Sequence, residues 1–118
     1  MPARVLIVDD DPRFRALART LLQARGFDVV AEAANGAEAL AAVEHLLPGA
    51  ALVDVQLPDV DGFALARTLT ESHNGLRIVV TSTDRTLVRP AALAEIPALA
   101  FVPKDQLAIT DLTPLLQS

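Results

Sequence analysis

The sequence contains no cysteine, tryptophan or tyrosine, and its aromatic residues are four phenylalanines. The absence of cysteine excludes a disulfide scaffold, a thiolate zinc site and a cysteine nucleophile. The shortage of aromatic rings argues against a base-stacking surface for single-stranded nucleic acid. No apolar run is long enough to span a bilayer, and the first residues do not resemble a signal peptide. We therefore expect a cytoplasmic protein that makes no membrane contact.

Basic residues are also scarce. Ten lysines and arginines stand against fifteen aspartates and glutamates, which gives a net charge of −5 and an isoelectric point near 4.8. A chain this negative binds the phosphate backbone poorly, so we expect no direct contact with nucleic acid. Lys104 is the sole lysine. Because an ammonium group is more compact than a guanidinium, this lysine marks a position where the shape of the cation matters.

The 118 residues, 52% hydrophobic and 21% charged, suit one globular domain. Short apolar runs alternate with helical patterns along the whole chain, and most runs are continuously apolar, as in parallel strands covered on both faces. We expect residues 1–118 to form a single domain without an output domain. Its predicted fold is a doubly wound α/β sandwich with a flavodoxin-like parallel sheet of order 2-1-3-4-5. The expected strands are Val5–Val8, Val29–Ala31, Ala50–Val53, Ile78–Val80 and Ala98–Val102.

The helices carry clear start and stop signals. Asp11 and Pro12 predict the start of the first helix, and Asn35 with Glu38 three residues later resembles a capping box for the second. A third is expected from Asp61–Gly62, a short fourth over Pro90–Glu95, and a last one interrupted by Pro114. Apolar residues at helical spacing are predicted to face inward in the first three helices: Phe14, Leu17, Ala18, Leu21 and Leu22; Ala39, Leu40, Val43 and Leu47; Leu65, Ala66 and Leu69. The apolar residues of the last expected helix are Leu107, Ile109, Leu112, Leu115 and Leu116.

Polar residues stand where the expected strands end. Asp9, Asp10 and Asp11 follow the first strand and Asp54 follows the third. In the order 2-1-3-4-5 these two strands are neighbours, so their carboxylates should meet at the edge where such folds bind ligands. Oxygen ligands without histidine or cysteine suit Mg²⁺.

The fourth and fifth strands add a hydroxyl and an ammonium group. Thr81 ends the fourth strand and Lys104 follows the fifth, where both can meet phosphoryl oxygens. A carboxylate can itself accept a phosphoryl group. The pattern therefore predicts metal-assisted phosphoryl transfer onto an aspartate.

Four stretches in register resemble the receiver domain of two-component response regulators. They are Val5–Asp10 (VLIVDD), Ala51–Gly62 (ALVDVQLPDVDG), Ile78–Thr81 (IVVT) and Phe101–Lys104 (FVPK). The resemblance covers essentially the whole chain. It implies a cytoplasmic phosphorelay protein, not an enzyme beyond self-catalysed phosphorylation and dephosphorylation.

The resemblance also implies roles for individual residues. Asp54 would be the phosphoacceptor, and Mg²⁺ would be held by Asp9, Asp10, Asp54 and the backbone carbonyl of Gln56. Thr81 would be the switch hydroxyl, Lys104 the lysine that pairs with the phosphoryl group, and Phe101 the aromatic switch. The implied partners are a sensor histidine kinase or phosphotransfer protein, and a downstream effector or a removed output domain. A second copy of the chain is a further candidate, through the face of the fourth helix, fifth strand and fifth helix.

Some features depart from the family or allow other readings. Pro103 precedes Lys104, whereas the family often places a proline after its lysine, and Ser82 beside Thr81 leaves two candidate switch hydroxyls. One alternative is a pseudo-receiver that docks partners without being phosphorylated. A less favoured one is a haloacid-dehalogenase-type phosphohydrolase with Asp9 as nucleophile. Asp11, Asp59 and Asp61 are interpreted as helix-cap and turn residues.

Overall fold

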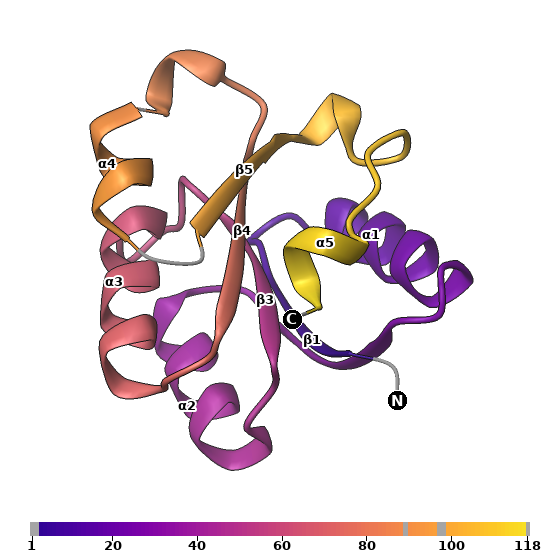
Figure 1. Cartoon of the computed structure of the whole chain (residues 1–118), viewed down its shortest axis with the longest axis horizontal. Coiled ribbons are helices and arrows are strands. Elements are labelled where there is room, and N and C mark those ends of the chain that lie inside the picture. Colours follow the sequence, from indigo (N-terminus) through magenta and orange to yellow (C-terminus); the bar gives the residue numbers. More distant parts are fainter. Residues whose placement is uncertain (1–2, 89, 97–98, 118) are drawn as a thin grey trace.

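The computed structural model of the chain describes residues 3–88, 90–96 and 99–117, and their strands form one parallel sheet (Figure 1). The observed strand order is β2-β1-β3-β4-β5, which confirms the flavodoxin-like prediction. Ala98, expected to begin the last strand, lies outside the described residues. The strands are β1 (Arg4–Val8), β2 (Asp28–Ala33), β3 (Ala50–Asp54), β4 (Arg77–Ser82) and β5 (Leu99–Pro103).

Helices cover both faces of the sheet: α2, α3 and α4 pack on one side, and α1 and α5 on the other (Figure 1). Among the described residues, no helix combines the length and the apolar character needed to cross a membrane. The α-helices are α1 (Pro12–Ala24), α2 (Gly36–Leu46), α3 (Gly62–Ser72), α4 (Pro90–Glu95) and α5 (Thr113–Leu116). Two 3₁₀ turns, η1 (Arg85–Leu87) and η2 (Lys104–Gln106), follow β4 and β5.

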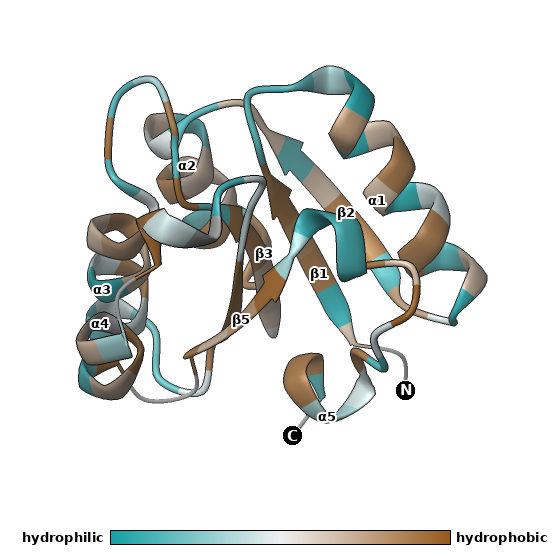
Figure 2. Ribbon diagram, turned by 90° about the horizontal axis from the view of Figure 1, so that it is seen from above, coloured by the Kyte–Doolittle hydropathy of each residue, from teal (hydrophilic) through white to brown (hydrophobic). Residues whose placement is uncertain are grey.

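The core is divided by the sheet because successive strand residues point to opposite faces. In β1, Leu6 and Val8 belong to the core under α2 and α3, whereas Val5 and Ile7 belong to the core under α1 and α5. All four are at most 1% exposed, so the strand needs apolar residues at each of these consecutive positions. Figure 2 shows the hydrophobic strands enclosed between the helices. The continuous apolar runs of the sequence are thus explained.

The helix starts follow the predicted caps. The Asp11 side chain accepts a hydrogen bond from the backbone amide of Arg13 at the start of α1. Asn35 accepts from the amide of Glu38 at the start of α2, and Asp61 caps α3. These interactions satisfy amides that lack a partner inside the helix. The predicted short helix over Pro90–Glu95 is likewise confirmed.

Three apolar residues predicted to face inward are exposed instead. Leu17 is 55% exposed because α1 contacts the sheet along a narrow stripe in which buried residues recur every fourth position: Phe14, Ala18 and Leu22. Leu40 is 41% exposed on the outer side of α2, and Leu47 lies just beyond that helix in a left-handed conformation. Ile109 was expected within the last helix, but its segment is not helical and its side chain is 77% exposed.

The segment after β5 is the largest departure from a regular helix. Pro114 lies in the first turn of α5, so the proline stands at the start of this four-residue helix and does not interrupt it. Residues 107–109 form a turn, and residues 110–112 connect it to α5 without helical structure. Two arginines bind its carbonyl groups. Arg25, just beyond α1, donates to the carbonyls of Leu107, Ala108 and Thr110. Arg77, at the start of β4, donates to those of Pro114 and Leu115 at 3.1 Å each.

Candidate functional site

The strand register brings the ends of β1, β3 and β4 together. Val8 of β1 pairs with Val53 of β3, so Asp9 and Asp54, the next residue of each chain segment, lie side by side. Asp54 in turn pairs with Thr81 of β4. All three polar residues are buried, with exposures of 2%, 7% and 1% for Asp9, Asp54 and Thr81. The sheet therefore gathers two carboxylates and a hydroxyl at one edge.

Asp10 completes an acidic cluster with Asp9 and Asp54. One carboxylate oxygen from each residue lies within 4.8 Å of the others, which is close enough for one ion to contact all three. Asp10 is exposed, so the cluster opens to solvent on its side. Mg²⁺ favours such a site because it takes a few carboxylates and keeps several water molecules.

Lys104 reaches into this cluster from the end of β5. Its Nζ atom lies 2.7 Å from Oδ2 of Asp9 and 3.3 Å from Oδ2 of Asp54. It also lies 4.4 Å from the centre of the Phe14 ring, in cation–π geometry. No described peptide bond is cis, so Lys104 attains this position without the cis proline bond that the family often has after its lysine. Burial acts to lower the pKa of Lys104, but the hydrogen bond and charge of Asp9, with those of Asp54, outweigh it and raise that pKa.

Opposing interactions act on the charged form of the Asp54 carboxylate, and the unfavourable ones are stronger. Burial raises its pKa above the ordinary value of 3.8, and the charge of Asp9 adds to this effect. A hydrogen bond from the amide of Gln56 to Oδ1 of Asp54, at 3.2 Å, and the charge of Lys104 oppose it. A second cation near Asp54 would favour the carboxylate form further.

Asp9 presents one carboxylate oxygen to the cluster and uses the other locally. Oδ1 accepts from the amide of Asp11 at 2.8 Å, and the backbone carbonyl of Asp9 accepts from Nη1 of Arg15 at 2.6 Å. Oδ2 is fully buried, and its contact among the described residues is the ion pair with the Lys104 ammonium, which leaves part of its acceptor capacity unused. A buried oxygen with that much unused acceptor capacity suits a metal ion. The donor set therefore fits Mg²⁺.

The two candidate hydroxyls differ in their surroundings. The Ser82 hydroxyl donates to the carbonyl of Asp84 at 2.9 Å and accepts from the amide of Asp84 at 3.0 Å, which commits it to the turn after β4. Thr81 is the residue that pairs with Asp54. Phe101 is half-buried beside Val80, packed against the core under α2, α3 and α4 rather than against the carboxylates.

Gly62 allows the start of α3 to touch the end of β3. A Cβ atom at this position would lie 2.2 Å from the carbonyl oxygen of Asp54 and 2.7 Å from Cα of Val55. The amide of Gly62 donates to the carbonyl of Val55 at 2.7 Å. Only glycine fits here without moving the backbone that carries Asp54.

Three residues near the cluster were not predicted from the sequence. Phe14, which contacts the Lys104 ammonium, was assigned to the core alone. Arg15, which donates to the Asp9 carbonyl and pairs with Glu32, was not singled out from the sequence. Asp59 was interpreted as a turn residue, but its side chain accepts hydrogen bonds at the start of α2. The sequence does carry a signal for Phe14. It is the first inward-facing residue of the helix that follows β1, and such a residue lies near the end of the preceding strand.

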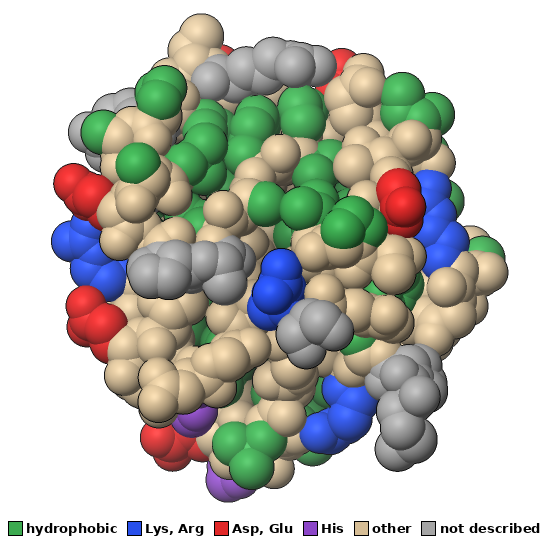
Figure 3. All heavy atoms as spheres, viewed as in Figure 1, with side chains coloured by type: hydrophobic (Ala, Val, Ile, Leu, Met, Phe, Trp, Pro, Cys, Tyr) green, Lys and Arg blue, Asp and Glu red, His purple; other side chains and the backbone are tan. Residues whose placement is uncertain are grey.

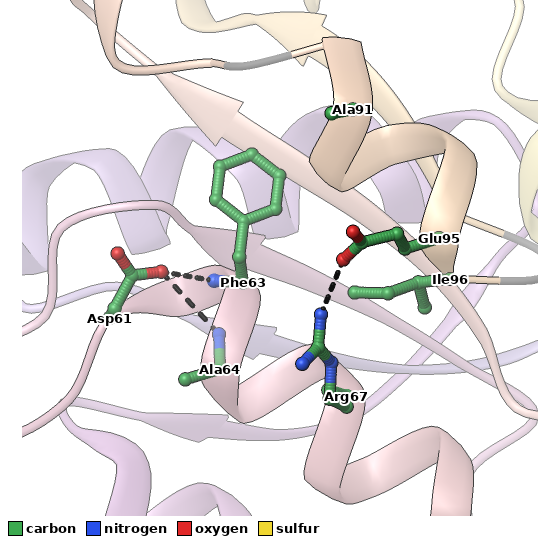
Figure 4. Close-up of a pocket in the computed structure, with 7 residues that line it drawn as sticks. All are labelled: Asp61, Phe63, Ala64, Arg67, Ala91, Glu95 and Ile96. Carbon is green, nitrogen blue, oxygen red and sulfur yellow. Dashed lines mark hydrogen bonds and ion pairs between the residues drawn. The ribbon is translucent and has the colours of Figure 1, made fainter.

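A separate cavity of 380 Å³ lies between α3 and α4 (Figure 4). Arg67 of α3 and Glu95 of α4 form an ion pair at 2.7 Å across it, with side chains 55% and 61% exposed. Phe63 and Ile96 supply apolar lining. Exposed ion pairs add little binding or folding energy, and the acidic cluster does not line this cavity. The chemistry therefore belongs to the strand ends and not to this cavity.

Comparisons with known proteins show which proteins this chain is similar to. The response regulator receiver domain family matches residues 5–116. The chemotaxis protein CheY of Bacillus subtilis is 34% identical over 82 residues, 70% of this chain and 68% of that protein. A protein-glutamate methylesterase/protein-glutamine glutaminase of Hahella chejuensis is 34% identical over 104 residues, 86% of this chain and 30% of that protein.

A solved structure shows the same similarity. The signal receiver domain of the response regulator NarL from Mycobacterium tuberculosis superposes with a TM-score of 0.78 at 31% sequence identity, covering 98% of this chain and 90% of that one. This chain spans half or less of the length of the first curated relatives that it matches.

Proposed function

Because this chain belongs to the response regulator receiver family, we propose that it accepts a phosphoryl group on Asp54 from the phosphohistidine of a sensor histidine kinase or phosphotransfer protein. The observation that carries this proposal is the meeting of Asp9, Asp10 and Asp54 with Lys104 at one edge of the sheet. The described residues form one sheet with its covering helices, which supports one receiver domain over residues 1–118.

The residues that would hold Mg²⁺ are Asp9, Asp10, Asp54 and the backbone carbonyl of Gln56. When bound, the metal would neutralise charge on the phosphoryl oxygens and on the carboxylates. The three carboxylates, within 4.8 Å of one another, supply the negative charge that binds it. Asp9 is positioned for this role by its bonds to the Asp11 amide and to Arg15.

In the proposed transfer, one carboxylate oxygen of Asp54 attacks phosphorus as the bond from phosphorus to the donor imidazole nitrogen breaks. The electron pair of that bond stays on the imidazole, and the product is an acyl phosphate on Asp54. Lys104 already contacts Asp54 and offers an ammonium to the developing phosphoryl charge. Thr81, paired with Asp54 in the sheet, offers a hydroxyl to the same group.

We propose that phosphorylation then alters the face made by α4, β5 and α5. Lys104 follows β5 directly and Phe101 lies within it, so movement of Thr81 and Lys104 toward the phosphoryl group acts on this strand. β5 is the edge strand, and Figure 3 shows hydrophobic side chains at the surface between α4 and α5. This face is the proposed contact for an effector, an output domain or a second copy of the chain.

Beryllofluoride, which stands in for the phosphoryl group, tests the proposal by NMR. With Mg²⁺ present we expect amide shifts at Asp54, Thr81 and Lys104, extending to Phe101. Asp54→Ala should remove them, and Glu44→Gln, a change on the outer face of α2, should leave them intact. Absence of shifts in the wild type would favour a pseudo-receiver. Shifts that persist in Asp54→Ala would exclude Asp54 as the acceptor.

A further inference from the structure

The loop between β3 and α3, residues 55–61, is closed at its base. Gln56 and Asp61 form an isolated antiparallel bridge, and the amide of Gly62 donates to the carbonyl of Val55 at 2.7 Å. The amide of Gln56 is also bonded to Asp54. The base of the loop therefore holds the backbone of Gln56 next to the acidic cluster.

The tip of the same loop is docked on the start of α2. Oδ1 of Asp59 accepts from the amide of Gly36 at 2.8 Å, and Oδ2 accepts from the amide of Ala37 at 3.1 Å. Val60 packs so closely that a Cβ atom on Gly36 would lie 2.4 Å from its Cγ1 atom. A polar contact and a steric contact thus join two segments that are far apart in the sequence.

The contact with Asp59 is additional to the capping hydrogen bonds that residues at the start of α2 make among themselves. Asn35 accepts from the amide of Glu38, and Glu38 accepts from the amide of Ala34, both at 2.9 Å. The amides of the first two helical residues are the ones given to Asp59. The bond from the Gly36 amide, with that from Ala37, holds the pKa of Asp59 below its ordinary value, as expected for a carboxylate at a helix start.

We propose that Asp59 is a positioning residue for the metal site. By docking the loop tip on α2, it holds the backbone of Gln56 where its carbonyl can serve as a ligand, and it couples occupancy of the acidic cluster to the start of α2. The inference rests on the proposed Mg²⁺ site. Because coupling between two sites is reciprocal, Mg²⁺ should also tighten the contact between Asp59 and α2.

Mg²⁺ titration by calorimetry tests the first half of the inference, with Asp59→Ala compared with Asn35→Ala. Both variants remove a side chain that accepts hydrogen bonds at the start of α2, but only the first undocks the loop. Removing a residue that supports a metal ligand weakens affinity about 10-fold or more, so we expect a loss of that order in Asp59→Ala and none in Asn35→Ala. Equal affinities in the two variants would overturn the inference.

Gly36→Ala distinguishes loop docking from helix stability. Alanine is the better helix former, so an effect through α2 alone predicts unchanged or tighter Mg²⁺ binding. Displacement of Val60 predicts weaker binding, restored when Val60→Ala is added to make room for the new methyl group. Unweakened binding in Gly36→Ala, or failure of the double variant to recover, would count against the inference.

Amide hydrogen exchange tests the reciprocal half. Mg²⁺ should slow exchange at Gly36 and Ala37 in the wild type and not in Asp59→Ala. No slowing in a wild type that binds Mg²⁺ would overturn the coupling. A wild type that does not bind Mg²⁺, or an Asp54→Ala variant that binds it equally well, would overturn the proposed metal site and this inference with it.

Discussion

The ammonium of Lys104 lies 2.7 Å from a buried oxygen of Asp9, inside the acidic cluster. The residue expected to meet a phosphoryl group thus also pairs with the carboxylates of the cluster. It pairs with Asp54 as well, at 3.3 Å. A cation that enters this cluster therefore competes with Lys104 for the same oxygens.

Lys104→Met should bind Mg²⁺ more tightly than the wild type. Loss of the ammonium frees Oδ2 of Asp9 and of Asp54 and increases the repulsion between the carboxylates. We expect an affinity gain of about tenfold, or about 1.4 kcal/mol, measured by calorimetry. The unfolding temperature in metal-free buffer should fall. Unchanged or weaker Mg²⁺ binding would mean that Lys104 does not compete with the metal.

Replacing Asp54 by asparagine and replacing Asp59 by asparagine should change the free energy of unfolding at neutral pH in opposite directions. Because burial raises the pKa of Asp54 above 3.8, the folded state takes up a proton more readily than the unfolded chain, and stability falls as pH rises from 3.8 through the raised pKa. Asp54→Asn should therefore be more stable than the wild type at neutral pH, with the gain shrinking toward pH 3.8.

Asp59→Asn is the matched comparison, because bonds from the Gly36 and Ala37 amides lower the pKa of Asp59. Its stabilising effect is present above pH 3.8 and is lost as pH falls through the lowered pKa. Asp59→Asn should be less stable than the wild type at neutral pH, and the difference should vanish in acid. Urea unfolding across this pH range measures both variants. The same sign for the two would refute the electrostatic account.

Gly62→Ala should be strongly destabilised. Its methyl group would overlap the Asp54 carbonyl, so α3 or the end of β3 must move, at a cost of about 3 kcal/mol or more. Gly49→Ala is the control, since a Cβ there meets nothing closer than the Arg4 carbonyl at 4.0 Å. The free energies of unfolding in urea should separate the two variants clearly. A Gly62→Ala protein as stable as Gly49→Ala would show that the contact can relax.

Arg25→Ala should loosen the segment that follows Lys104. Three carbonyl groups lose their guanidinium partner, which we expect to cost about 1 kcal/mol because water replaces part of the interaction. Amide exchange of residues 107–112 should accelerate. Arg19→Ala, which removes an ion pair between α1 and Glu32 of β2, should leave that exchange unchanged. Equal exchange in both variants would deny Arg25 this anchoring role.

The sequence was sufficient for the elements whose signals are local. Continuous apolar runs predicted the buried strands, and Asp11, Asn35 and Asp61 predicted three helix starts, because each cap acts on the amides that follow it. Helical periodicity failed for Leu17, since it does not indicate how wide the covered stripe of a helix is. The helix expected around Ile109 is not formed, because apolar spacing alone does not indicate whether the backbone is helical.

The strand order predicted that the strand-end residues meet, but not the individual side-chain contacts that distant segments make there. That Lys104 lies between two carboxylates and against Phe14 depends on where β5 ends relative to β1 and α1. That Asp59 bonds the start of α2 depends on how the loop folds back. In both cases the side chain contacts a group that is tens of residues away in the sequence. The spacing of residues along the chain does not indicate which of these distant groups a side chain will contact.

The most direct measurement of the central claim is the intact mass of the protein after treatment with acetyl phosphate and Mg²⁺. The wild type should gain one phosphoryl group, chelation of Mg²⁺ should suppress the gain, and Asp54→Asn should show none while keeping the wild-type circular dichroism spectrum. Undiminished labelling of Asp54→Asn, or a phosphoryl group mapped to Asp9, would contradict the assignment of Asp54 as the phosphoacceptor.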